Sequence, residues 1–141
     1  MADYYNRCVE RDLEFGLAEE ERLLPVFREK FDNLLCKTGE GSVVDYISPK
    51  TYIELKSRNI NHDDHDDIMI GANKIRFAER TPKKVILAFN FRDGVYYYEF
   101  KREDLTNGVI DFRLGGRKDR GRDERKTCGY IKRTNMKRLD F

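Results

Sequence analysis

Residues 52–57 alternate between two kinds of side chain, and this pattern constrains the fold strongly. The stretch has the twofold periodicity of a β-strand, in which successive side chains point to opposite faces. Glu54 and Lys56 therefore share one face, while Ile53 and Leu55 share the other. A carboxylate beside an ammonium group is poor material for a hydrophobic core. We therefore expect this strand to present one face to a core and the other to a polar site.

The pattern around this strand predicts alternating helices and strands. Apolar residues at helical spacing favour a helix that contains Pro25, and Arg92-Asp93-Gly94 has good hairpin chemistry. The order of these elements predicts an α/β fold with a small mixed central sheet flanked by helices, in one domain over residues 1–141. The elements expected are a helix at 15–36, strands at 42–47 and 51–58, an acidic loop at 59–67, a helix from Asp66 or Asp67 to about Glu79, strands at 83–91 and 95–100, and short strands at 109–114 and 130–131.

Composition narrows the class of protein. The chain has 141 residues, of which 39% are hydrophobic and 38% charged, which suits a single domain with a charge-rich surface. No apolar run is long enough to span a bilayer, and the first residues lack a signal-peptide pattern. Cys8, Cys36 and Cys128 are far apart and form no CxxC, so we expect neither a disulfide framework nor a zinc site. We expect a reduced, intracellular protein without a membrane partner, in the cytoplasm or in the nucleus of a host cell.

The net charge of +2 conceals an asymmetry. Residues 113–138 hold eleven basic and three acidic residues, an excess of +8, while the rest hold 17 basic and 23 acidic, or −6. A basic C-terminal segment on an acidic body indicates a polyanionic partner, nucleic acid first. One alternative is a solvated tail, and another is a partner protein bound by charge. A non-catalytic nucleic-acid-binding module is the alternative function, with Tyr96, Tyr97 or Tyr98 stacking on bases.

Asp45 lies on the strand expected before residues 52–57. A connection of two or four residues would place Asp45 opposite Glu54, whereas three residues would offset them by one. Two carboxylates about 4 Å apart repel by roughly 4 kcal/mol at an effective dielectric constant near 20, so they need a cation or a shared proton. Oxygen ligands favour Mg²⁺ or Mn²⁺, and Lys56 would then assist an attacking water. The alternative is that Glu54 and Lys56 form an ordinary surface pair.

The first helix offers a third acid. At about 100° per residue, Glu20 falls near 300°, in the middle of the apolar stripe, and Glu21 falls near 40°, at its edge. A glutamate on a core-facing stripe is costly unless it is paired or binds metal, so Glu20 is preferred over Glu21. A kink at Pro25 that turns Glu20 toward water is the alternative. The apolar residues that define the stripe are Leu17, Leu24, Phe27 and Phe31.

This order of acids and lysine resembles the PD-(D/E)xK nuclease superfamily, with its restriction-endonuclease-like fold, over residues from about 15 to 100. The resemblance implies a Mg²⁺- or Mn²⁺-dependent DNA endonuclease in which Lys56 assists the water. Asp45, Glu54, the Leu55 backbone carbonyl and Glu20 would hold the metal. The sequence departs from the family pattern at Val44, where proline is common, and glutamate at the second acid position is one of the usual forms.

Small size and the basic end are also similar to phage-type Holliday junction resolvases. Residues 52–59, 71–75 and 115–121 are similar to small nuclease-like proteins of large DNA viruses. A junction substrate, or cutting of both strands, would favour a homodimer. Duplex, junction, single-stranded DNA and RNA all stay open as substrates.

Several basic residues are expected to bind nucleic acid. Lys74 on the second helix could touch the scissile phosphate or be solvated, and Arg58 could bind phosphate or form a surface ion pair. The contiguous acidic stretch 62–67 holds two histidines and could bind a transition metal, although such a loop usually solvates itself. The nucleic-acid-binding set is Arg58, Lys74, Arg113, Arg117, Lys118, Arg120 and Arg122.

Overall fold

The computed structural model describes residues 2–116, 121, 123 and 125–141. Two helices, nine strands and three short 3-10 turns are found in this part of the chain. In order they are α1 (Ala2–Lys30), β1 (Cys36–Lys37), β2 (Tyr46–Ile47), β3 (Thr51–Ser57), a 3-10 turn (His62–Asp64), β4 (Asp67–Gly71), α2 (Ala72–Arg80), β5 (Lys84–Phe91), β6 (Gly94–Glu99), a 3-10 turn (Arg102–Leu105), β7 (Ile110–Gly115), β8 (Lys126–Lys132), a 3-10 turn (Arg133–Asn135) and β9 (Lys137–Arg138).

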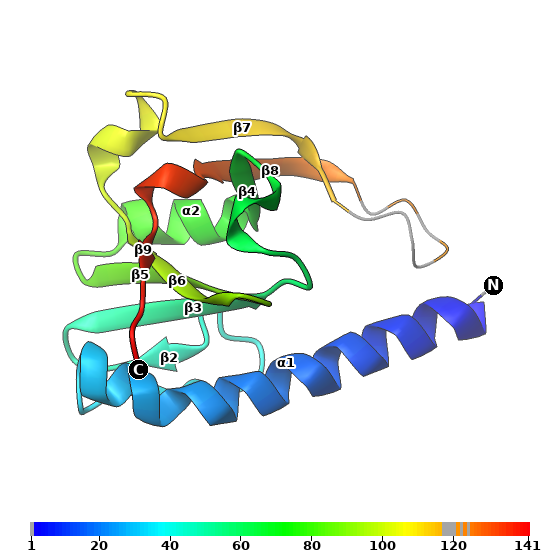
Figure 1. Cartoon of the computed structure of the whole chain (residues 1–141), viewed down its shortest axis with the longest axis horizontal. Helices are drawn as coiled ribbons and strands as arrows, with labels where there is room; N and C mark the ends of the chain where they lie inside the picture. The colour runs from blue at the N-terminus through cyan, green and yellow to red at the C-terminus, as the bar shows by residue number, and fades with distance from the viewer. Residues whose placement is uncertain (1, 117–120, 122, 124) are drawn as a thin grey trace.

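The central sheet is mixed. Its strand order is β1-β2-β3-β5-β6-β9, and only β3 and β5 are parallel among the pairs described. The predicted α/β fold, with a small mixed sheet and helices, is confirmed. A second, antiparallel sheet of order β4-β8-β7, which the sequence analysis did not predict, lies over α2 (Figure 1).

Two cores cover the two faces of the central sheet. Helix α1 packs on one face, where Leu23 and Phe27 are fully buried against Ile53. Helix α2 and the second sheet cover the other face, where Ile75 and Ile131 meet Leu87 of β5 (Figure 1). Because both faces of β5 are covered, residues 85–91 are buried without interruption.

The alternation predicted for residues 52–57 is present in β3. Ile53 and Leu55 join the core beneath α1. Tyr52 packs edge-on against Phe77 of α2, and Glu54 contacts Lys74 of the same helix. The polar face of β3 is therefore turned toward α2, with Glu54 buried and Lys56 partly exposed.

The second helix begins later than predicted. Neither Asp66 nor Asp67 starts it, because residues 67–71 alternate buried and half-buried as strand β4, and Ile68 pairs with Ile131 of β8. Gly71 is the N-cap of α2, which ends at Arg80. The helix predicted from Asp66 or Asp67 includes Ile68 and Ile70, but the alternation of these two residues is a signal of a strand.

The first helix also has other bounds than predicted. It begins at Ala2, runs through Pro25 and ends at Lys30, because residues 31–35 form turns that lead into β1. Asp32 stabilises this connection by accepting a hydrogen bond from the Leu34 backbone N–H at 2.9 Å. No described helix is long and apolar enough to cross a membrane.

Candidate active site

A tight connection sets the register between Asp45 and Glu54. The Ser48 N–H donates to the Thr51 carbonyl at 2.9 Å across a two-residue loop, and Tyr46 pairs with Ile53. The Asp45 N–H donates to the Ile53 carbonyl at 3.0 Å, so Asp45 lies beside the Ile53–Glu54 peptide. The Leu55 N–H donates to Oδ2 of Asp45 at 2.8 Å, which fixes the carboxylate beside β3.

Glu54 is a buried carboxylate between two lysines. Only 2% of its surface is exposed. Oε1 lies 3.5 Å from Nζ of Lys56, and Oε2 lies 3.3 Å from Nζ of Lys74. Despite this ion pair, Oε2 accepts no well-directed hydrogen bond from the described residues. Lys74 instead directs its ammonium group to the Val43 carbonyl. Oε2 is thus an underused oxygen inside the protein.

Negative charge accumulates around Glu54. Burial raises the pKa of Glu54 to about 7, and repulsion from Asp45 adds to the shift, while Lys56 and Lys74 oppose it. Burial likewise raises the pKa of Glu20 to about 7, with Asp45 and then Glu54 contributing, against Lys37. Burial, together with repulsion between the carboxylates, therefore outweighs the stabilisation that the nearby lysines give to the charged forms.

Helix α1 brings Glu20 to the same place. The Tyr46 hydroxyl donates to the Glu20 backbone carbonyl at 2.6 Å and anchors the helix over the end of β2. Glu21 points elsewhere, since its side chain is 77% exposed and lies 3.9 Å from Lys37. A pocket of about 260 Å³ is lined by Glu20, Asp45, Glu54, Lys56 and Lys74 together with parts of α1 and β3.

The donor set fits a hard divalent cation. No group of three or more His, Cys, Asp or Glu side chains in the described ranges is arranged to hold a metal ion. Mg²⁺ needs fewer, because it is usually bound by one or two carboxylates, with waters and substrate phosphates completing its shell. Asp45 and Glu54 supply two carboxylates, and Oε2 of Glu54 lacks a directed donor. Their crowding is what a bound cation would relieve.

The predicted nucleic-acid-binding residues do not all gather at this pocket. Lys74 lies in it and is not solvated, since its side chain is 17% exposed. Arg58 lies at the end of β3 and donates to the Met69 carbonyl at 3.5 Å. Arg113 pairs with Asp67 and lies 3.9 Å above the Tyr130 ring. The remaining four, Arg117, Lys118, Arg120 and Arg122, lie outside the described residues.

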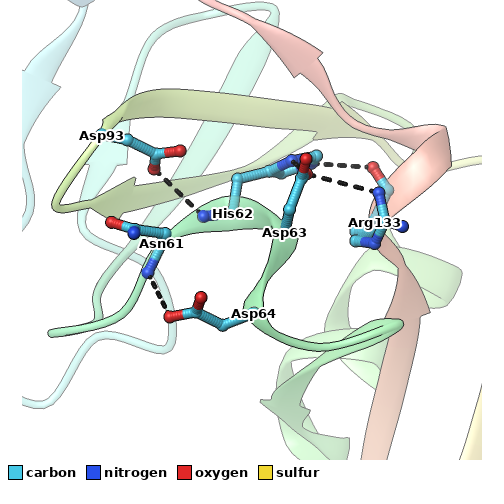
Figure 2. Close-up of polar contacts among 6 residues, drawn as sticks. All are labelled: Asn61, His62, Asp63, Asp64, Asp93 and Arg133. Carbon is cyan, nitrogen blue, oxygen red and sulfur yellow. Dashed lines mark hydrogen bonds and ion pairs between the residues drawn. The ribbon is translucent and has the colours of Figure 1, made fainter.

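The histidine-rich loop is built differently from a metal site. Figure 2 shows His62 held between Asp63 and Arg133: Nδ1 lies 2.5 Å from Asp63 and Nε2 lies 3.0 Å from the Arg133 carbonyl. Its ring stacks on Tyr96 at 3.9 Å, and its backbone N–H donates to Asp93. Both ring nitrogens have protein partners, so His62 anchors the loop to the body.

His62→Ala should lower stability without changing the dependence of any cleavage on divalent ions. The variant loses a buried stacking partner of Tyr96 and the contact with the Arg133 carbonyl, which together stabilise by about 1–3 kcal/mol. Thermal melts and a Mg²⁺ titration of cleavage would check this. A large rise in the Mg²⁺ concentration needed by a folded variant would contradict it.

The three consecutive tyrosines already have partners within the protein. Tyr98 is buried and its hydroxyl donates to Asp104, Tyr96 stacks on His62, and Tyr97 meets Phe31 edge-on. Base stacking by these rings is therefore not favoured.

Two contacts of the site were not predicted from the sequence: the hydrogen bond of the Tyr46 hydroxyl to the Glu20 carbonyl and the Lys74–Glu54 ion pair. Both join elements that are distant in the sequence, so they leave no local pattern.

A known protein family matches most of the chain, including most of the residues of the candidate site. The sequence model of the family described as "Phage putative PDDEXK endonuclease" matches residues 31–132, which is more than half of the chain. The matched span contains Asp45, Glu54, Lys56 and Lys74, while Glu20 precedes it. No curated protein and no solved structure gives a significant match. The resemblance drawn from the sequence is confirmed at the level of the superfamily, and the chain belongs to this phage PD-(D/E)xK endonuclease family.

Proposed function

We propose that the protein is a divalent-metal-dependent endonuclease that hydrolyses phosphodiester bonds in DNA. The observation that carries the proposal is the buried Glu54 carboxylate, which pairs with Lys56 on the same strand and lies next to the Asp45 carboxylate that the Leu55 N–H holds beside β3. Asp45, Glu54 and the Leu55 carbonyl would hold Mg²⁺ or Mn²⁺. Glu20 is the additional acid that could reach the ion, directly or through water.

Each residue has a role that follows from its position. When bound, the ion supplies Lewis-acid stabilisation of the charge that develops on the phosphate and makes water more acidic. Lys56 lies at the mouth of the pocket with 31% of its side chain exposed, where its ammonium can orient the attacking water or stabilise negative charge. Lys74 holds the Glu54 carboxylate in place from α2.

A cleavage assay with defined DNA forms tests the proposal. Labelled single-stranded, duplex and four-way-junction DNA would be incubated with Mg²⁺, Mn²⁺ or EDTA. We expect products with Mg²⁺ or Mn²⁺ and none with EDTA. A preference for the junction would support the resemblance to resolvases, and paired cuts in both strands would call for two copies of the chain. Binding of DNA without cleavage under any divalent ion would instead favour the non-catalytic binding module.

A further inference from the structure

A second hollow lies along α1 next to the candidate site. It has a volume of about 610 Å³ and is lined on the helix side by Arg11, Asp12, Phe15, Glu19 and Arg22. Its other wall is formed by the last residues of β5, Asn90 and Phe91, and by residues that directly follow β3 and β5, namely Arg58, Asn59 and Arg92. Of the α1 residues that line the candidate site, Asp12 also lines this hollow, whereas Leu13, Gly16, Leu17 and Glu20 do not.

A third hollow of about 690 Å³ joins these two. It shares Gly16, Lys56 and Ser57 with the candidate site, and it shares Phe15 and Asn59 with the second hollow. Its walls are α1 on one side and, on the other, the end of β3, the residues that follow it and Met69 in the middle of β4. Because neighbouring hollows share lining residues, the three together form a passage along α1 that leads to the site. Figure 1 shows the N-terminal half of α1 extending past the ends of the strands of the central sheet.

The passage combines cations with an exposed aromatic ring. Arg92 donates to Asn59 at 2.8 Å and forms no ion pair with a described carboxylate. The Arg11 side chain is 72% exposed and lies 3.7 Å from Asp12, a carboxylate that also lines the passage. Phe15, at 57% exposure, lines both the second and the third hollow. Arginine matches phosphate oxygens, and an exposed ring beside it offers a surface on which a base can stack.

We propose that this passage binds unpaired nucleotides next to the scissile phosphate, so that the substrate is DNA with a single-stranded segment. A base reaches an aromatic side chain only when it is outside a duplex stack. Hollows of this volume suit a ligand the size of a few nucleotides and not a double helix. The position of the cut rests on the proposed function, whereas binding of the single strand does not.

Two exposed residues test the binding with matched controls. Binding of a labelled single strand of about 12 nucleotides would be measured by fluorescence anisotropy in EDTA. Phe15→Ala should raise Kd about tenfold, while Phe141→Ala, another exposed phenylalanine that lines none of the three hollows, should not. Arg92→Ala should reduce the slope of log Kd against log salt by about 0.7, unlike Arg102→Ala.

Gly16 offers a variant that separates binding from folding. A side chain at this helical position would meet no heavy atom within 4 Å of its Cβ, so it extends into the passage. Gly16→Ala and Gly16→Leu should both raise the melting temperature, because glycine is unfavourable inside a helix. Only Gly16→Leu should raise Kd for the single strand, by about tenfold or more.

The outcomes distinguish this inference from the proposed function. Loss of binding in Phe15→Ala and Gly16→Leu, with cleavage of overhang DNA but not of blunt duplex, would support both. If the two variants lose binding but the wild type cleaves no DNA, the proposed binding of single strands is supported and the proposed nuclease function is overturned. Unchanged binding in both variants, or equal cleavage of blunt and overhang duplexes, would overturn the passage alone.

Discussion

Lys56→Ala and Asp45→Asn should each reduce DNA cleavage by about 10³-fold or more while the protein stays folded. Asp45→Asn keeps an oxygen that can accept the hydrogen bond from the Leu55 N–H and removes only the negative charge. Lys56 is 31% exposed, so its truncation opens no closed cavity. Both changes therefore act on the proposed chemistry far more than on packing.

Single-turnover rates on the best DNA substrate, with circular dichroism spectra of each variant, would measure the effect. Lys101→Ala and Asp140→Asn are matched controls, because both residues are exposed and line none of the hollows around α1. They should cleave like the wild type. Cleavage by a clean Asp45→Asn preparation at a rate close to that of the wild type would exclude Asp45 from the site.

The central strand and its acids could be predicted because their signals are local. Alternation in β3 and the spacing from Asp45 to Glu54 depend on neighbouring residues and one short connection. The sequence left the length of that connection open, and the Ser48–Thr51 hydrogen bond selects the two-residue form. Helical spacing likewise identified Glu20 as the acid on the inner side of α1.

Features that depend on distant pairing could not be predicted. Residues 67–71 carry a short strand alternation, but their pairing with β8, about 60 residues later, has no signal in the local sequence. The contact of Lys74 with Glu54 requires α2 to cross β3, which the sequence does not specify. The first half of α1 leaves Leu13 and Phe15 exposed, so the apolar periodicity that predicted a helix from residue 15 did not extend to its true start.

Glu54→Gln should stabilise the metal-free protein at about pH 8 and have little effect at about pH 5. The folded pKa of Glu54 is about 7, above the ordinary value of 4.5, so the folded state binds this proton more tightly than the unfolded state does. Stability of the wild type is therefore lost as pH rises from about 4.5 through about 7. Glutamine resembles the protonated form, so the variant escapes this loss.

The expected gain at about pH 8 is up to about 3 kcal/mol, or roughly 10 °C in Tm, because Glu54 is 2% exposed and little screened by water. Melting curves in EDTA at the two pH values would measure it, with Glu99→Gln on the exposed end of β6 as the control.

Mg²⁺ should raise the Tm of the wild type at about pH 8 and have less effect on Glu54→Gln, because the variant lacks one carboxylate ligand. A gain of equal size at both pH values would mean that packing, and not the crowded charge that a cation would neutralise, explains the effect. A gain confined to high pH and cancelled by Mg²⁺ would tie the instability of this buried carboxylate to the ion that it is proposed to hold.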